Sequence, residues 1–277
     1  MSGRRCARCG AGIVAHAVRE GVVRRCAASF AQMSISRTSY PRMYRLVQRL
    51  PLCGGCLEEM PAIGSEICAH CGRERLQASQ AAEWIVRSPG NMLCQDCRAA
   101  GSSPLRANRS LLRYNEWGKE LLGLYKYRGD ERLAELFASL LVIGLHCHYR
   151  PERIDSLAAV PLHVKRLRER GFNQVELVAR RVSEACRIPY QQLLVRTRET
   201  KKLSQQSGRL ARRESVQGAF SINGDAGRAV LAKQSAPYAI LLVDDVYTTG
   251  STLRECAKTI LDSQHNEICI FSLTIFR

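Results

Sequence analysis

The chain has 277 residues, 45% of them hydrophobic, a composition typical of one large or two ordinary globular domains. It carries 42 Lys and Arg against 25 Asp and Glu, a formal charge of +17. That excess favours an anionic partner such as nucleic acid, a nucleotide or a phosphorylated sugar. For any single arginine, a solubilising role on an exposed helix face is an equally good interpretation.

The N-terminus, "MSGRRCARCG", is charged and has no apolar segment behind it, so no secretory signal is visible. The longest apolar run, Leu136–Leu145, is about half of what a membrane-spanning helix needs. We therefore expect a cytoplasmic protein without membrane insertion. The 13 cysteines of such a protein predict metal binding rather than disulfides.

Four CxxC pairs occupy the first third of the chain: Cys6 and Cys9, Cys53 and Cys56, Cys68 and Cys71, and Cys94 and Cys97. One CxxC turn directs two thiolates at one point, and two turns complete a tetrahedral zinc site with no open position. The simplest pairing is sequential and gives two consecutive structural zinc ribbons within residues 1–100. Gly10 and Gly72 fit the tight turn after the second ligand of a pair. A redox role for one pair is less favoured when four occur in tandem.

Other cysteines receive no metal role. The insertion 10–52 is basic and Ser-rich, and we expect it to be partly disordered. Cys26 lies there and has no assigned function. "HCHY", which begins at His146, invites a metal assignment, but the end of a helix is the better interpretation. The remaining cysteines fall in apolar patterns typical of small buried thiols: Cys147, Cys186, Cys256 and Cys269.

Beyond residue 100 the pattern changes to alternating helices and strands, after an entry loop "AAGSSPL". Two helical segments fill 116–145 and break at "YRGD"; a strand then runs to Pro161, and a helix with Asn173 as N-cap follows. Strands are predicted at 191–196, 218–222, 238–245 and 267–276, and a helix at 251–264. Residues 196–215 are polar and basic, which indicates a mobile loop. This order predicts an α/β domain over 101–277, with a parallel sheet flanked by helices.

Ligands of such sheets bind beyond the carboxyl ends of the strands. The stretch "AILLVDDVYTTGST", residues 239–252, places Asp244 and Asp245 at one such end. "TTGST" then opens a helix, where backbone amides and the helix dipole favour an anion. The lysine of a P-loop is missing. The arrangement suits a sugar with its 5′-phosphate at the turn and its hydroxyls on the carboxylates. The simpler alternative is a strand end with solvated carboxylates.

The same stretch resembles the phosphoribosyl-pyrophosphate (PRPP) motif of type I phosphoribosyltransferases. Further matches are "KYRGD" from Lys126, "VPLHVKRLRERGFNQVELVAR" from Val160 and "GAF" from Gly218. Together with the cysteine pairs, these segments resemble the ComF family, which joins a double zinc ribbon to a phosphoribosyltransferase-like domain. Several of its members are linked to natural competence and use of imported DNA. Only the insertion between Gly10 and Leu52 lacks a counterpart.

The resemblance implies roles for individual residues. Asp244 and Asp245 would bind the ribose hydroxyls at the catalytic centre, with Mg²⁺ on the pyrophosphate. The 5′-phosphate loop would be Thr248, Thr249, Gly250, Ser251 and Thr252. Candidates for pyrophosphate binding are Leu162, His163 and Arg166, and the basic loop 196–213 would close over the site.

Some of these assignments have alternatives. Purine-salvage enzymes carry an acid where Thr248 stands, so that mechanism is not expected. His163 can also be structural. "KRLRER", residues 165–170, can be an exposed turn, a pyrophosphate contact or a nucleic-acid contact.

Three functions follow from these observations. The first is Mg²⁺-dependent transfer of ribose 5-phosphate from PRPP to an unidentified nucleophile. The second is a non-catalytic competence factor that binds single-stranded DNA through phosphates and works with other competence proteins. The third is a regulator that senses PRPP without turning it over.

Overall fold

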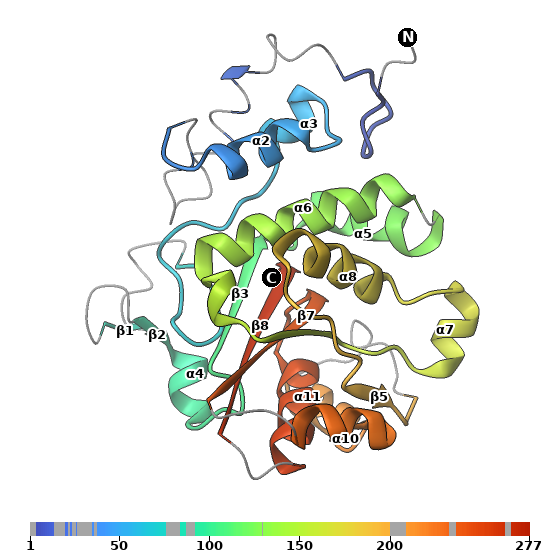
Figure 1. The fold of residues 1–277 in the computed structure, drawn as a ribbon. Coiled ribbons are helices and arrows are strands. Elements are labelled where there is room, and N and C mark those ends of the chain that lie inside the picture. Colours follow the sequence, from blue (N-terminus) through green and yellow to red (C-terminus); the bar gives the residue numbers. More distant parts are fainter. Residues whose placement is uncertain are drawn as a thin grey trace.

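A four-stranded parallel sheet in the order β3–β8–β7–β4 forms the centre of the C-terminal part (Figure 1). In this computed structural model the described residues are 4–13, 20, 21, 23, 26, 35, 38–75, 84–86, 92–128, 130–199, 209–232, 237–263 and 267–277. The strands are β1 (Trp84–Val86), β2 (Met92–Cys94), β3 (Ala107–Leu112), β4 (Ser156–Ala159), β5 (Leu194–Arg196), β6 (Phe220–Ile222), β7 (Tyr238–Val246) and β8 (Ile268–Phe276).

Helices precede the sheet and connect its strands. They are α2 (Pro41–Arg49), α3 (Gly54–Glu58), α4 (Gln95–Ala100), α5 (Glu116–Arg128), α6 (Glu131–His148), α7 (Val164–Arg170), α8 (Gln174–Cys186), α9 (Arg209–Val216), α10 (Gly224–Ala232) and α11 (Ser251–Asp262), with a short 3₁₀ turn at Pro151–Arg153. In the part of the chain that the structure describes, no helix has both the length and the apolar character to cross a membrane.

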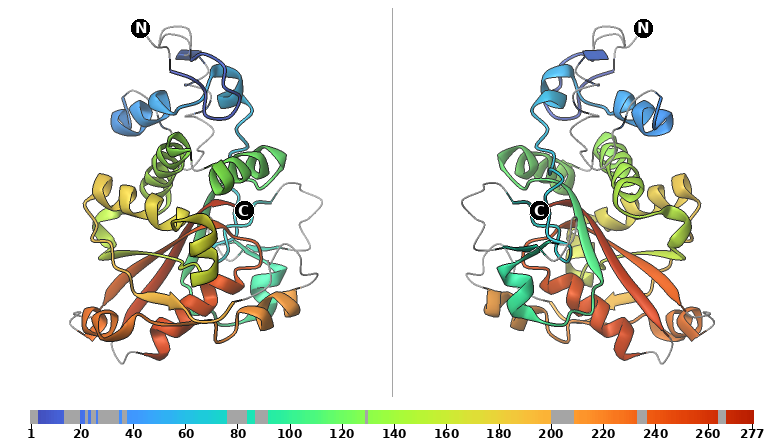
Figure 2. Two further views of the ribbon diagram at one scale, coloured as in Figure 1. Left: turned by 90° about the vertical axis from the view of Figure 1, so that its right-hand side faces the viewer. Right: turned by 90° about the vertical axis from the view of Figure 1, so that its left-hand side faces the viewer.

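Strand β7 is apolar along most of its length because both of its faces are covered. Successive side chains of a strand point to opposite faces. Leu241 and Val243 accordingly pack in the core formed with α5, α6 and α8, whereas Ile240 and Leu242 pack with α11. Figure 2 shows the green and yellow helices on one side of the strands and α11, in red, on the other. The predicted parallel sheet with helices on both faces is confirmed.

Side-chain caps fix where two of the covering helices begin. Asp130 accepts a hydrogen bond from the amide of Arg132 at 2.9 Å, which starts α6 directly after the predicted break. Asn173 accepts from the amide of Val175 at 3.1 Å, so the predicted N-cap of α8 is confirmed. Such caps satisfy amides that have no partner within the helix.

Strand β3 was not predicted, because its buried side chains are partly polar. Asn108 and Ser110 are buried, and each bonds across to β8. Asn108 Oδ1 accepts from Ser272 Oγ at 2.9 Å, and the hydroxyls of Ser110 and Thr274 lie 2.6 Å apart. Paired in this way, polar side chains can be buried without an apolar pattern in the sequence.

Three helices also differ from the sequence prediction. The "KRLRER" segment is helix α7 rather than a turn. Helix α9 occupies the second half of the expected mobile loop, whose residues 200–208 lie outside the described part. Helix α10 follows β6 without having been anticipated. Within the insertion 10–52, α2 packs Met43 and Val47 into the core, so this part is ordered; most of 14–37 lies outside the described residues.

The two cysteine-bearing regions attach to different parts of the sheet domain. The first, around α2 and α3, packs on α6, and its Arg8 donates to Glu120 at 2.9 Å and lies over the ring of Trp117 (Figure 1). The second, around α4, lies beside β3, where the amide of Asn108 donates to the carbonyl of His70 at 2.7 Å. A domain boundary at residue 100 remains a prediction, since cores extend across it on both sides.

Candidate functional site

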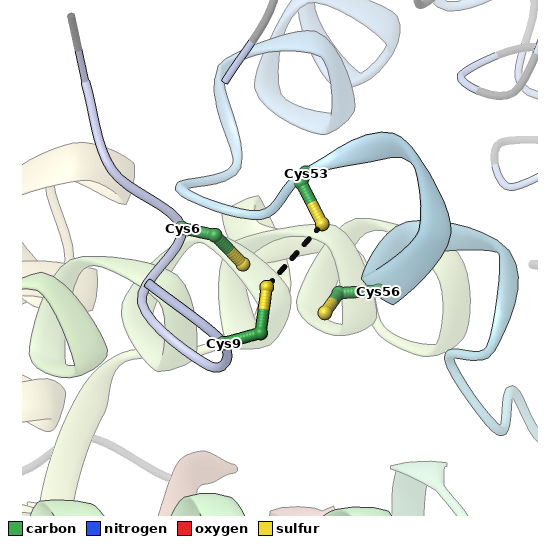
Figure 3. A group of neighbouring side chains, drawn as sticks. All are labelled: Cys6, Cys9, Cys53 and Cys56. Atoms are coloured by element: carbon green, nitrogen blue, oxygen red, sulfur yellow. Dashed lines mark hydrogen bonds between the residues drawn. The ribbon is translucent and has the colours of Figure 1, made fainter. Parts of the chain in front are cut away.

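The eight paired cysteines form two clusters with the predicted sequential pairing. One holds Cys6, Cys9, Cys53 and Cys56 (Figure 3), and the other holds Cys68, Cys71, Cys94 and Cys97; within each, the sulfurs lie within 4.8 Å of one another. The Sγ atoms of Cys9 and Cys53 are 3.6 Å apart, and those of Cys71 and Cys94 are 3.7 Å apart. A tetrahedron with 2.3 Å zinc–sulfur bonds requires about 3.8 Å. Both clusters can therefore bind zinc as closed, structural sites.

Among the described residues, the "HCHY" segment belongs to no such cluster. It ends α6 as predicted, and Nδ1 of His146 lies 2.8 Å from the carbonyl oxygen of Val142 in the preceding turn. Cys256 is completely buried, as predicted for a packing thiol, while Cys147, Cys186 and Cys269 are half-buried.

The register of β4 against β7 builds the candidate ligand site. Ala159 pairs with Val243, and the amide of Val160 donates to the carbonyl of Val243 at 3.0 Å. The segment after β4 therefore lies directly beside Asp244 and Asp245. A cavity of about 490 Å³ opens at this edge of the sheet.

Most of the predicted ligand-binding residues line this one cavity. They are Asp244, Asp245, Thr248, Gly250, Ser251, Thr252, Leu162, His163 and Arg166. Thr249 does not; it lines a second cavity of about 310 Å³ on the other side of the turn. The second cavity shares Tyr247, Thr248 and Ser251 with the first.

The N-terminus of α11 lacks the side-chain cap that α6 and α8 possess. Its N-cap is Gly250, with φ of 74° and no capping side chain. A Cβ at Gly250 would lie 2.2 Å from the hydroxyl oxygen of Tyr247, so only glycine fits the turn. The hydroxyls of Thr249 and Ser251 are 2.6 Å apart. The amide of Ser251 donates to Oγ1 of Thr249 at 3.4 Å, and the N-cap residue offers no side chain to the amides that follow. The first turn of α11 thus begins beside the cavity, at a position suited to an external anion.

The two carboxylates differ in their surroundings. Asp245 forms an ion pair with Lys126 at 2.5 Å. Burial, reinforced by the charge of Asp245, raises the pKa of Asp244 to about 7. Burial opposes the charge of Lys126, but the interaction with Asp245 outweighs it and raises the pKa of Lys126. The site therefore holds one firmly paired carboxylate and one whose proton is exchangeable near neutral pH.

His163 has a structural contact in addition to its place at the cavity. Its Nδ1 accepts from the amide of Lys165 at 3.3 Å, which caps α7. Arg166, one turn on, pairs with Glu169 at 3.0 Å. The structural alternative for His163 is therefore supported by geometry, and Arg166 remains beside the cavity.

Besides Lys119, three cations line the cavity that sequence reasoning did not name as individual site residues: Lys126, Arg170 and Arg196. The available signal was their place in the noted segments "KYRGD" and "KRLRER" and at the start of the basic loop. Arg196 ends β5 and lies over the ring of Phe220 at 5.3 Å, and burial lowers its pKa. Tertiary packing brings these residues to the sheet edge from α5, α7 and β5.

The chain is similar over most of its length to three competence proteins. It is 28% identical to Competence protein ComFC of Bacillus subtilis, over 82% of this chain and 84% of that protein. It is 28% identical to ComFC of Streptococcus pneumoniae, over 80% of this chain and 86% of that protein. It is also 28% identical to Competence protein F of Haemophilus influenzae, over 80% of this chain and 89% of that protein. No protein-family model matches the chain. These relatives and the two four-cysteine clusters bear out the resemblance to the ComF family of competence proteins.

Proposed function

We propose that this protein binds PRPP with Mg²⁺ and transfers the ribose 5-phosphate group to a nucleophile during use of imported DNA. One observation carries the proposal. The acidic pair at the C-terminal end of β7, the N-terminus of α11 with its glycine N-cap and the segment after β4 line a single cavity of about 490 Å³. The cavity thus offers groups complementary to a phosphate, a diol and a pyrophosphate, all of which PRPP carries.

Each part of the cavity has a distinct task in this proposal. The amides of Ser251 and Thr252 hold the 5′-phosphate, where the helix dipole stabilises negative charge. Asp244 and Asp245 accept hydrogen bonds from the ribose hydroxyls. Lys126 fixes Asp245 through their ion pair, so this carboxylate is oriented before the ligand arrives.

The cations around the cavity serve the transfer step. The bond between ribose C1 and a pyrophosphate oxygen breaks, C1 bonds to the nucleophile, and pyrophosphate leaves with the electron pair. Negative charge grows on the leaving group, and Arg166 and Arg196 line the cavity where they can neutralise it. Positioning and charge neutralisation are the main contributions that the chain makes.

The donor set at the acidic pair fits Mg²⁺, which prefers oxygen ligands and keeps several waters. Asp244 and Asp245 offer carboxylate oxygens beside the cavity. The bound ion would supply charge to the pyrophosphate. The two four-cysteine clusters, in contrast, offer only sulfur and suit zinc.

Thermal unfolding of the zinc-loaded protein tests the proposal. We expect PRPP with Mg²⁺, at a hundredfold excess over Kd, to raise Tm by roughly 5 °C or more. Asp244→Asn combined with Asp245→Asn should abolish the shift. A matched control removes two exposed carboxylates that do not line the cavity, Asp225→Asn with Asp262→Asn, and should retain it.

Absence of any shift in the parent protein at millimolar PRPP would contradict both transfer and PRPP sensing. A shift without pyrophosphate release, in the presence of a mixture of nucleophiles, would leave PRPP sensing and exclude transfer to the nucleophiles tested.

A further inference from the structure

The second cavity lies where several separate parts of the molecule meet. Its volume of about 310 Å³ is lined by the second cysteine-bearing region, the segment 100–105, α9, the turn before α11, the exposed face of α11 and Arg277. Pockets of about this size and above hold small-molecule ligands. None of the residues assigned to PRPP, except those of the shared turn, belongs to it.

The lining of this cavity is strongly basic. Arg73 and Asp96 form an ion pair at 2.5 Å and neutralise each other. The remaining acid, Glu255, accepts a hydrogen bond from the amide of Gly218 at 2.6 Å. The cavity is also lined by four cations that have no ion pair within the described part of the chain: Arg213, Arg254, Lys258 and Arg277.

Helix α11 presents two of these cations side by side. Arg254 and Lys258 are four residues apart and therefore lie on one face of the helix, one turn apart. The opposite face, with Cys256 and Ile260, is buried against the sheet. Like charges at this spacing destabilise an isolated helix, so a bound anion would remove an existing repulsion.

Arg277 is the most rigidly held of the four. Its guanidinium lies over the ring of Tyr247 at 4.7 Å and donates to Sγ of Cys71 at 3.2 Å. Its buried Nη1 has no hydrogen-bond partner among the described residues. A guanidinium fixed in this way loses little conformational freedom when it binds phosphate.

From this geometry we infer that the second cavity is a separate binding site for a phosphate ester of mononucleotide size. Guanidinium groups bind phosphate oxygens through paired, charge-assisted hydrogen bonds, and Lys258 adds a point charge. Since Tyr247, Thr248 and Ser251 line both cavities, a ligand here would contact the reverse side of the turn that faces the first cavity.

The test must separate this site from the first cavity, which is also expected to attract phosphate. Thr252 lines only the first cavity, and Thr252→Glu places a negative charge there. Glutamate in the first turn favours the helix, so the variant should fold. The probe is inorganic phosphate added to the full zinc-loaded chain at constant ionic strength, with thermal unfolding as the readout.

In the Thr252→Glu background, phosphate should still raise Tm. Adding Arg254→Gln with Lys258→Gln should weaken the apparent phosphate affinity about tenfold or more. The matched control adds Arg42→Gln with Arg45→Gln, two exposed arginines on α2, and should leave the affinity unchanged.

Three results would overturn the inference. Loss of the whole response in Thr252→Glu would place all binding in the first cavity. Equal weakening in the α11 and α2 variants would indicate attraction by net charge alone. No response to phosphate, with Arg254- and Lys258-dependent binding of an oligothymidylate, would assign the surface to single-stranded DNA instead.

Discussion

The two four-cysteine clusters share a motif and a pairing but differ in what surrounds them. In the first cluster Cys9 is exposed, and the region packs on α5 and α6, away from the candidate ligand site. In the second all four cysteines are buried, and Cys71 contacts Arg277 in the wall of the second cavity. Identical metal motifs can thus serve different purposes: the first holds a helical layer, and the second supports a binding surface.

Removing one cysteine from each cluster should have the largest effect and tests whether the two clusters contribute differently to stability. Cys71→Ser should lose one zinc equivalent and cost several kcal/mol of unfolding free energy, since binding of structural zinc is coupled to folding. Cys9→Ser should also lose one zinc but cost less, because its cluster is partly exposed. Zinc content and urea denaturation measure both. Equal costs would show that burial of the cluster does not matter.

The glycines that follow the second cysteine of each region provide a finer comparison. Gly10 and Gly72 both have positive φ, 74° and 67°, so alanine is strained at either position. A Cβ at Gly10 would contact nothing within 4 Å, whereas one at Gly72 would lie 2.8 Å from the carbonyl oxygen of Asn108. We expect Gly10→Ala to cost about 1 kcal/mol and Gly72→Ala about 3 kcal/mol by chemical denaturation. Similar costs for the two substitutions would mean that the β3 backbone moves away from the new Cβ with little energetic penalty.

Substitution of Asp244 shows whether the charged form of this buried carboxylate in the first cavity destabilises the folded protein. The pKa of Asp244 is raised to about 7 from 3.8, so the folded state binds a proton that the unfolded state has lost. This contribution favours folding at low pH and disappears as pH rises through about 7. Asp244→Asn should therefore raise Tm by about 2–4 °C at pH 8, and the difference should shrink towards pH 4. A constant difference across this range would contradict the assigned pKa.

Loss of a side-chain contact between the first ribbon and the helical layer should have the smallest effect. Arg8 pairs with Glu59 and Glu120 and lies over Trp117. Arg8→Met should cost about 1 kcal/mol, since exposed ion pairs and cation–π contacts contribute little. Phosphate and PRPP responses should be unchanged, which thermal shifts can check. A loss of either response would tie the first ribbon to the ligand site after all.

The sequence was sufficient wherever a pattern depends on neighbours along the chain. The CxxC spacing predicted both clusters, the apolar runs predicted β7 and β8, and Asn173 marked the start of α8. It was insufficient wherever a contact depends on packing. The approach of Lys126 to Asp245 follows from how α5 lies on the sheet, and the turn directs Thr249 away from the cavity of its neighbours.

The polar pairs between β3 and β8 have a consequence for assembly. Asn108 faces Ser272 and Ser110 faces Thr274 in register, each pair hydrogen-bonded in the interior. A slip by one residue would turn every side chain of β3 to the opposite face and leave these groups buried without partners. The edge strand β3 can therefore pair with β8 in only one register. Because the His70 carbonyl accepts a hydrogen bond from the amide of Asn108, that register also fixes where along β3 the second cysteine-bearing region packs.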